Sequence, residues 1–277
     1  MTGGRSTVRP ARAFQPRRGD PVLTRRRAQA AMVLIMVLSI SVAVLGDIPN
    51  LAGRWVMLQV YPQIAVLPLA GEVNQSSYVI QQVEIEQHGG MLTMLDSYCF
   101  TYVDSGTPLV STEIPAAFMA ALRPTPRIAT VMEQDDEILF AQEPYIEIRG
   151  AVLENPETDE LPEGPDDPRV VDQDGDGNPG MTVSAKIFGI NAGETYVVQR
   201  VRYVLTGTVI SLDRIEGTIE WSDEQSILDV SNPILRAGAS SSPDPDPAKH
   251  VFVMIRAQEG WTCEWLAAHW RELFGVE

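Results

Sequence analysis

The chain has 277 residues and a formal net charge of −16, from 21 Lys+Arg against 37 Asp+Glu. Eight of those basic residues are arginines within the first 27 positions, so the rest of the chain is more acidic than the average suggests. A body this acidic lacks the clustered cations that bind a phosphate backbone, which excludes nucleic acid as the main partner. A hydrophobic fraction of 44% argues against global disorder and fits one folded domain.

The N-terminal region has the layout of an export segment. Residues 1–29 are basic, and Arg25-Arg26-Arg27 directly precede residues 30–46, of which Ala30–Leu45 contain no charge, Gly or Pro. This order is typical of a signal peptide or a membrane anchor. Because the arginines stay cytoplasmic, we expect residues 47–277 to be exported as a single domain, and to be periplasmic, on the outer surface or secreted. Only the N-terminal segment would contact a membrane, and whether it is cleaved stays open.

Two cysteines, Cys99 and Cys263, lie in the expected exported part. An even cysteine count in an oxidising compartment predicts one disulfide between them. Two buried free thiols are the alternative.

Alternating polar and apolar residues predict about ten strands after residue 47. Ile215–Trp221 is the clearest, with Ile215, Ile219 and Trp221 on one face. The others expected are a strand opening at Gly53, then Tyr78–Gln87, Met91–Val103, Glu137–Gln142, Tyr145–Leu153, Met181–Phe188, Thr195–Thr206, Gly207–Leu212, Ile227–Val230 and Val251–Ala257. Turns are expected at His88-Gly89-Gly90 and Asn191-Ala192-Gly193. The predicted fold is all-β, either an antiparallel barrel or a sandwich, and the lack of strand–helix alternation excludes a Rossmann-type fold.

Helical spacing is concentrated at the C-terminus. Cys263–Phe274 is predicted to be a helix with Thr262 as its N-cap, packed on the outside of the sheet. A second helix is predicted over Pro115–Leu122. Two segments are predicted to be exposed loops, namely the acidic stretch 154–180 and the Ser/Pro-rich stretch 238–247.

The most specific motif is Asp172-Gln173-Asp174-Gly175-Asp176-Gly177. It resembles the first half of calcium loops of the EF-hand and thrombospondin-repeat types, in which alternate carboxylates converge on one hard cation. The resemblance implies Asp172, Asp174, Asp176 and the carbonyl of Asn178 as ligands of a structural calcium ion. Position twelve, where an EF-hand has Glu, is Val183. A solvated acidic loop and a metal-free structural turn are the alternatives.

Gly53-Arg54-Trp55 resembles the signature that opens lipocalin and other calycin barrels. The resemblance implies a lipocalin-like barrel, closed at its base by Trp55 against an arginine from a late strand, for which Arg256 is the candidate. An ordinary core tryptophan is the alternative.

Three aromatic residues of one predicted strand, Tyr98, Phe100 and Tyr102, share a face by alternation. Such a stripe forms either part of the core or the wall of a ligand cavity.

No catalytic constellation emerges from the sequence. The three histidines belong neither to a metal motif nor to the neighbourhood of a nucleophile elbow. The sequence therefore favours a non-enzymatic envelope protein that binds a small apolar ligand. The alternative is a structural or interaction protein of the cell surface, whose partner is another envelope protein. Ligand identity, oligomeric state and the existence of any activity stay open.

Overall fold

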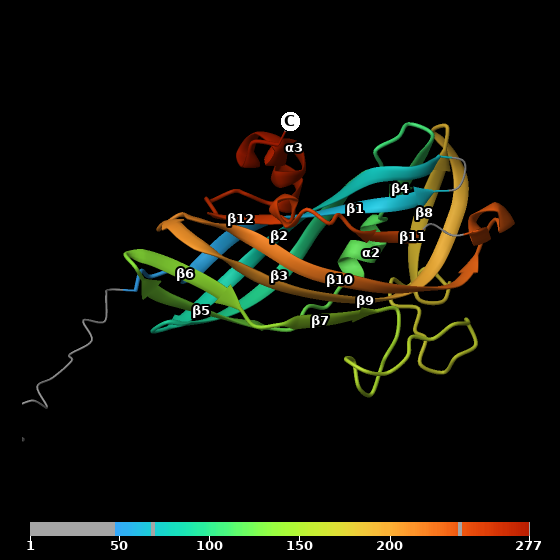
Figure 1. Cartoon of the computed structure of the whole chain (residues 1–277). Coiled ribbons are helices and arrows are strands. Elements are labelled where there is room, and N and C mark those ends of the chain that lie inside the picture. The colour runs from blue at the N-terminus through green and yellow to red at the C-terminus, as the bar shows by residue number, and fades with distance from the viewer. Residues whose placement is uncertain (1–47, 68–69, 238–239, 277) are drawn as a thin grey trace, which may run out of the picture. The chain divides into compact units, whose positions relative to one another are not determined.

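The computed structural model describes residues 48–67, 70–237 and 240–276, and these belong to one compact unit (Figure 1). The predictions for residues 1–29 and 30–46 lie outside the described residues. Within the described part of the chain, no helix is long and apolar enough to cross a membrane.

Twelve strands form one sheet, and every pairing between them is antiparallel. They are β1 (Gly53–Leu67), β2 (Gly71–His88), β3 (Met91–Asp104), β4 (Val110–Glu113), β5 (Arg127–Gln134), β6 (Glu137–Gln142), β7 (Tyr145–Arg149), β8 (Met181–Ile187), β9 (Ile190–Ser211), β10 (Arg214–Val230), β11 (Ser240–Pro243) and β12 (Val251–Arg256). Two α-helices, α2 (Ala116–Ala121) and α3 (Cys263–Phe274), and two short 3₁₀ helices, η1 (Pro233–Ala237) and η2 (Pro247–Lys249), complete the described elements. The expected antiparallel β class with a C-terminal helix is confirmed.

The strand pairings return to their starting point. Neighbours follow the order β10-β12-β1-β2-β3-β5-β6-β9-β8-β4, and β9 also pairs with β10. The return is uneven, because β3 and β5 pair over only four residues and β6 and β9 over only three. At the other end of the unit, β8 pairs with β9 and β4 pairs with β8, whereas β7 pairs with the middle of β9 (Figure 1). At the end that contains β5, β6 and β12, here called the tightly paired end, strand pairings continue all the way around. At the end that contains β4 and β8, here called the widened end, β4 pairs with β8 only, among the described residues.

One predicted turn falls inside the long strand β9. The prediction of a turn at Asn191-Ala192-Gly193 is wrong, since these residues lie inside β9. The chain turns instead at Phe188 and Gly189, with φ angles of 52° and 75°. Glycine adopts such angles freely, whereas Phe188 is one of only a few non-glycine residues described with a positive φ. Asparagine and glycine are common in turns, but here Asn191 and Gly193 already pair with Lys186 and Ala185 of β8.

Strand boundaries differ from expectation elsewhere. The predicted strands Thr195–Thr206 and Gly207–Leu212 form one strand, β9, and Ile215–Trp221 and Ile227–Val230 likewise form one strand, β10. The sequence did not predict β5. Part of the predicted loop 238–247 is also wrong, because Ser240–Pro243 form β11 and pair with Gln63–Val66 of β1. β12 pairs with β1 only over Trp55–Gln59, so β11 supplies the hydrogen-bond partners for the later part of β1.

Helix α3 lies on the outer face of the sheet, as predicted. The Thr262 hydroxyl accepts a hydrogen bond from the Trp265 amide at 3.2 Å, which caps the helix N-terminus. Leu266 and Trp270 are buried against outward side chains of β1 and β2. The predicted disulfide between Cys99 and Cys263 is present, with a Cα–Cα distance of 5.1 Å, and ties the first turn of α3 to β3. The predicted helix at Pro115–Leu122 is present as α2.

Candidate ligand-binding cavity

The widened end of the sheet contains a partly open cavity of about 280 Å³. Its walls are the inward faces of β1, β2, β3, β8, β9 and β10, together with α2. Much of the lining is apolar, including Leu67, Val79, Phe118, Met119, Leu122, Val183, Val197, Val201 and Ile227. Polar side chains also line the cavity, among them Gln59, Tyr61, Gln63, Gln75, Tyr98, Arg149, Gln199, Tyr203, Asp223 and Gln225. A cavity that combines apolar side chains with polar groups able to orient a ligand is the usual form of a small-molecule site.

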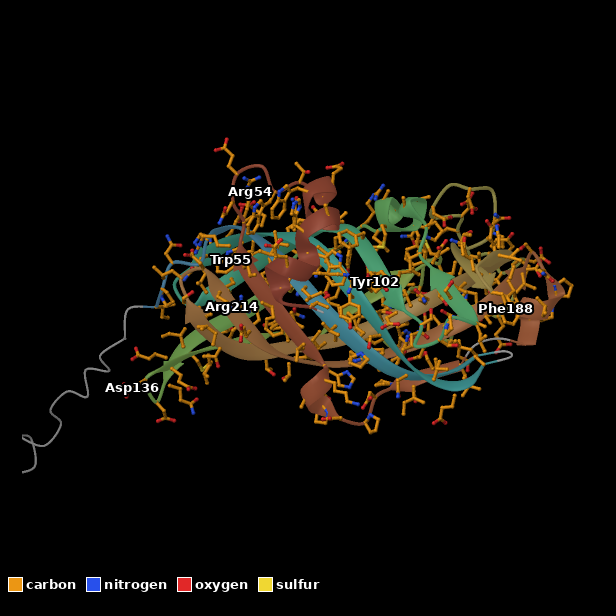
Figure 2. All side chains as sticks on the ribbon, turned by 90° about the horizontal axis from the view of Figure 1, so that it is seen from above. Arg54, Trp55, Tyr102, Asp136, Phe188 and Arg214 are labelled. Carbon is orange, nitrogen blue, oxygen red and sulfur yellow. A yellow bond between two sulfur atoms is a disulfide. The ribbon has the colours of Figure 1, made fainter. Side chains whose placement is uncertain are left out.

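The aromatic stripe predicted on β3 divides between two faces. Tyr98 lines the cavity, whereas Phe100 and Tyr102 lie on the outer face and contact Trp270 of α3, with ring centroids 6.3 and 5.8 Å away. The prediction that all three line a cavity is therefore wrong for Phe100 and Tyr102 (Figure 2 labels Tyr102). The cause is a β-bulge: Ile80 pairs with Phe100 and Gln81 with Tyr98, so Cys99 is an extra residue that reverses the alternation.

A buried ion pair lies next to the cavity wall, because the Arg127 guanidinium is 5.7 Å from the centroid of the Tyr203 ring. Arg127 of β5 and Asp96 of β3 approach to 2.6 Å, and both side chains are fully buried. Gln142 accepts a further hydrogen bond from the Arg127 guanidinium. Burial raises the pKa of Asp96 against the opposing charge of Arg127. Replacing only one of the two residues would leave the other charge buried and uncompensated, so we expect loss of either residue to destabilise the fold.

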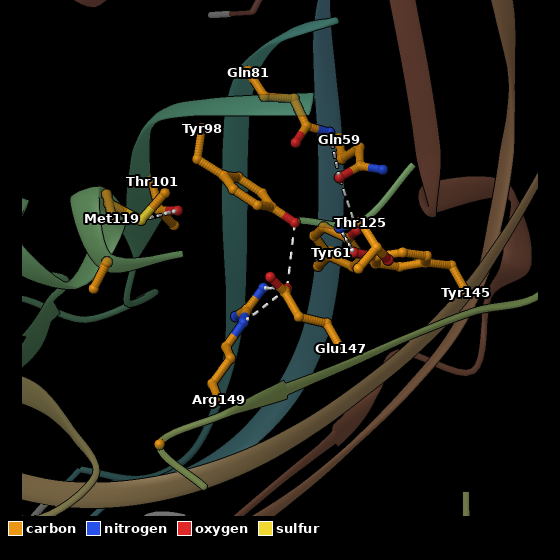
Figure 3. Close-up of polar contacts among 12 residues, drawn as sticks. Gln59, Tyr61, Gln81, Tyr98, Thr101, Met119, Thr125, Tyr145, Glu147 and Arg149 are labelled. Carbon is orange, nitrogen blue, oxygen red and sulfur yellow. Dashed lines mark hydrogen bonds and ion pairs between the residues drawn. The ribbon is translucent and has the colours of Figure 1, made fainter. Parts of the chain in front are cut away.

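A second ion pair lies directly beside the cavity. Glu147 and Arg149, both on β7, are joined by Arg149 Nε and Nη2, at 2.9 and 2.6 Å from Glu147 Oε2. The Tyr98 hydroxyl donates to the same oxygen at 3.3 Å (Figure 3). Nearby, the Tyr61 hydroxyl donates to Gln59 Oε1 at 3.0 Å. These contacts fix the polar side chains that face the cavity.

Several of these groups keep hydrogen-bonding capacity in reserve. The Tyr203 hydroxyl, Glu147 Oε1, Gln59 Nε2 and Gln199 Oε1 are buried and have no hydrogen-bond partner among the described residues. Burial raises the pKa of Tyr98 and of Tyr203 well above the usual range, so both hydroxyls stay protonated. Three of these unpaired groups, on Tyr203, Gln59 and Gln199, belong to residues of the cavity wall.

Sequence reasoning did not find these polar residues. Tyr145, Glu147 and Arg149 alternate on one face of a predicted strand, and charged alternation normally marks the solvent side. Here that face points inward. The ion pairs reveal this. Glu147 is paired with Arg149 on the same strand, whereas the partner of Asp96 is recognised only once β3 and β5 are in register.

Trp55 and Arg256 meet at the tightly paired end of the sheet. They are direct cross-strand partners in β1 and β12, and the Arg256 guanidinium lies 4.5 Å from the centroid of the Trp55 ring. Trp55 is fully buried, and its indole N–H donates to the Leu51 carbonyl at 2.8 Å. The contact that the calycin resemblance implied between these two residues is thus present.

The three aspartates of the DxDxDG motif also converge. One carboxylate oxygen from each of Asp172, Asp174 and Asp176 lies within 4.8 Å of the others. Asp172 accepts hydrogen bonds from the amides of Gly175 and Gly177 at 2.8 and 2.9 Å, so the loop already has a folded turn. Asp174 Oδ1 is buried without a partner among the described residues, which suits a cation ligand.

Other contacts of this loop compete with metal binding. The Thr182 hydroxyl donates to Asp176 Oδ2 at 2.6 Å, and the Asn178 amide donates to Asp176 Oδ1 at 2.8 Å. Val183, at position twelve, lies in β8 and lines the cavity. The donor set therefore fits a calcium ion only in part.

No protein-family model, curated protein or solved structure matches this chain.

Proposed function

We propose that this protein binds a small, largely apolar ligand inside a lipocalin-like barrel. The observation that carries the proposal is the cavity of about 280 Å³ between the strands of the sheet and α2. Protein interiors are normally close-packed, so a cavity of this size inside a sheet is typical of a ligand-binding site. The Trp55–Arg256 contact and the return of the strand pairings to β10 support the barrel architecture.

A cavity-filling variant tests this proposal. Val183→Trp places a large ring in the cavity, and Ile210→Trp places the same ring on an exposed position of β9. Calorimetric titration of the full chain with hexanol should give binding in the wild type and in Ile210→Trp, and none in Val183→Trp. Equal hexanol binding by all three proteins would contradict a site in this cavity.

We further propose that the domain is exported and that a calcium ion stabilises its acidic loop. The arginine-then-apolar order of residues 1–46 supports export, and the disulfide suits an oxidising compartment. Protease added to intact spheroplasts should degrade the folded domain. Complete protection, together with no periplasmic or extracellular pool, would contradict export.

An interaction protein of the cell surface is the second candidate function. Phe188 and Ile190, at the turn between β8 and β9, are 65% and 72% exposed. Exposed large apolar side chains at one hairpin tip are typical of contact surfaces. If this is the function, the hexanol titration shows no binding, and Phe188→Ser abolishes a concentration-dependent association measured by sedimentation velocity.

A further inference from the structure

Two charged side chains line the cavity within the described chain, Arg149 and Asp223. The charge of Arg149 is matched by Glu147, through two hydrogen bonds to one carboxylate oxygen. Asp223, on β10, makes no hydrogen bond or ion pair with another described residue. The carboxylate of Asp223 is therefore the unmatched charge of the cavity wall.

The groups around Asp223 do not supply the missing cation. The deeper pair of Arg127 and Asp96 is neutral overall, as is the pair of Arg149 and Glu147. Burial raises the pKa of Asp223, even though the charge of Arg149 acts in the opposite direction. A carboxylate that is mostly withdrawn from water and unpaired favours an incoming positive charge.

Aromatic rings stand beside this carboxylate. Trp221 precedes Asp223 by two residues on β10, so both side chains point to the same face, and both line the cavity. Tyr61 meets Trp221 edge to face, with ring centroids 5.2 Å apart. A cation held near such rings is attracted by their π-electrons in addition to the carboxylate.

We infer that the cavity takes a protonated amine with a small apolar body, its ammonium group on the Asp223 carboxylate beside Trp221 and Tyr61. The apolar body then lies against the lining side chains of α2 and β8, such as Phe118, Met119 and Val183. This inference rests on the proposed function, because it assigns a ligand class to the same cavity. It differs from that proposal in requiring a positive charge on the ligand.

Three six-carbon ligands that differ in charge distinguish the contribution of charge to binding affinity from that of apolar burial. The full chain is titrated calorimetrically with hexylamine, hexanol and hexanoate at neutral pH. Because a charge-assisted hydrogen bond is added, hexylamine should bind at least about tenfold more tightly than hexanol, and hexanoate most weakly. Asp223→Asn should reduce hexylamine affinity to that of hexanol, whereas Asp223→Glu should keep part of the preference.

A matched control variant and the melting temperature show whether a change in affinity results from misfolding. Asp229→Asn removes an acid from the same strand that is paired with Arg236 on the surface, and it should leave all three affinities unchanged. The Asp223→Asn variant should melt no lower than the wild type, since an unpaired buried charge is lost. Equal binding of hexylamine and hexanol, or tighter binding of hexanoate, would overturn the inference and leave the cavity proposal standing. Failure of all three ligands to bind would overturn both.

Discussion

The guanidinium of Arg256 joins three separate parts of the chain over the face of Trp55. Its Nε lies 2.9 Å from Asp213 Oδ1, in the turn between β9 and β10, and its Nη1 lies 3.0 Å from the Ala52 carbonyl. Nη2 adds the carbonyls of Leu212 and Asn50 at 2.8 and 3.2 Å. One side chain thus satisfies backbone groups that would otherwise be left at the end of the sheet.

Arg256→Lys should therefore destabilise the fold although the charge is kept. Lysine cannot reproduce the planar fork, so several of these hydrogen bonds and part of the ring contact are lost. We expect the free energy of unfolding to fall by about 1–3 kcal/mol in urea denaturation. Arg236→Lys, in an exposed pair with Asp229, is the control and should change it by less than about 0.5 kcal/mol. Equal effects of the two variants would contradict a special role for Arg256.

Gly217 is expected to tolerate no side chain. It pairs with Gly207 across β9 and β10, and a Cβ added at Gly217 would lie 2.1 Å from the Thr206 carbonyl oxygen and 2.7 Å from Phe252 Cε1. Gly217→Ala should lower the free energy of unfolding by about 2 kcal/mol or more. Gly164→Ala, where a Cβ meets nothing within 4 Å, should be nearly neutral. A neutral Gly217→Ala would show that the two strands can separate at little cost.

The Cys99–Cys263 disulfide should contribute strongly to stability. It closes a loop with a sequence separation of 164, and a long loop restricts the unfolded chain most in the chain-entropy model. Replacing both cysteines with serine should lower the free energy of unfolding by about 2–5 kcal/mol. A reductant should destabilise the wild type and leave the double variant unchanged. If the reductant affects both proteins equally, the disulfide is not the cause.

Calcium should raise the melting temperature if the acidic loop binds it. At a free calcium concentration tenfold above the dissociation constant, binding stabilises the folded state by about 1.4 kcal/mol, or roughly 2–4 °C in a domain of this size. Asp174→Asn should abolish this shift between chelator and calcium, whereas Asp166→Asn, elsewhere in the acidic loop, should keep it. The absence of a shift in the wild type would leave Asp172, Asp174 and Asp176 as a structural turn.

Asp223 should make the ligand-free fold less stable as pH rises. Its pKa is raised by burial, so between the ordinary aspartate pKa of about 4 and the raised value the folded state binds more protons than the unfolded state. The free energy of unfolding therefore falls as pH increases through that window. Asp223→Asn should flatten this part of the curve and stabilise the protein at neutral pH. A wild-type pH dependence that the substitution leaves unchanged would refute the assignment.

The sequence predicted those features that local patterns determine. Thr262 at the helix start, the Cys99–Cys263 pair and the alternation of Ile215–Trp221 each depend on neighbouring residues or residue type, and each is found in the structure. Features decided by register were not predictable in this way. The extra residue at Cys99 reverses the faces of Phe100 and Tyr102, and nothing in the alternation of β3 itself signals it.

The cavity illustrates the same limit. Glu147 and Arg149 look like solvent-facing residues until β7 is placed on β9, and Asp223 looks like one acid among many. The cavity-facing positions of these side chains depend on how β7, β9 and β10 pair with one another. A single sequence gives the residue types of the cavity wall but not the compensation of their charges.

The pairing of β1 with β12 sets the order in which this domain can be completed. Trp55 and Arg256 are neighbours in space but stand near opposite ends of the folded chain, and the two strands that flank β12 are β1 and β10. During synthesis from the N-terminus, β1 and β2 can form a hairpin early, whereas the edge of β1 at Trp55–Gln59 stays uncovered until β12 has emerged. Such a non-local closing step implies slow folding and a partly formed sheet that is prone to pairing with other chains. A protein truncated before Val251 would retain its cavity-lining residues on β1 and β10 yet expose both of those strand edges.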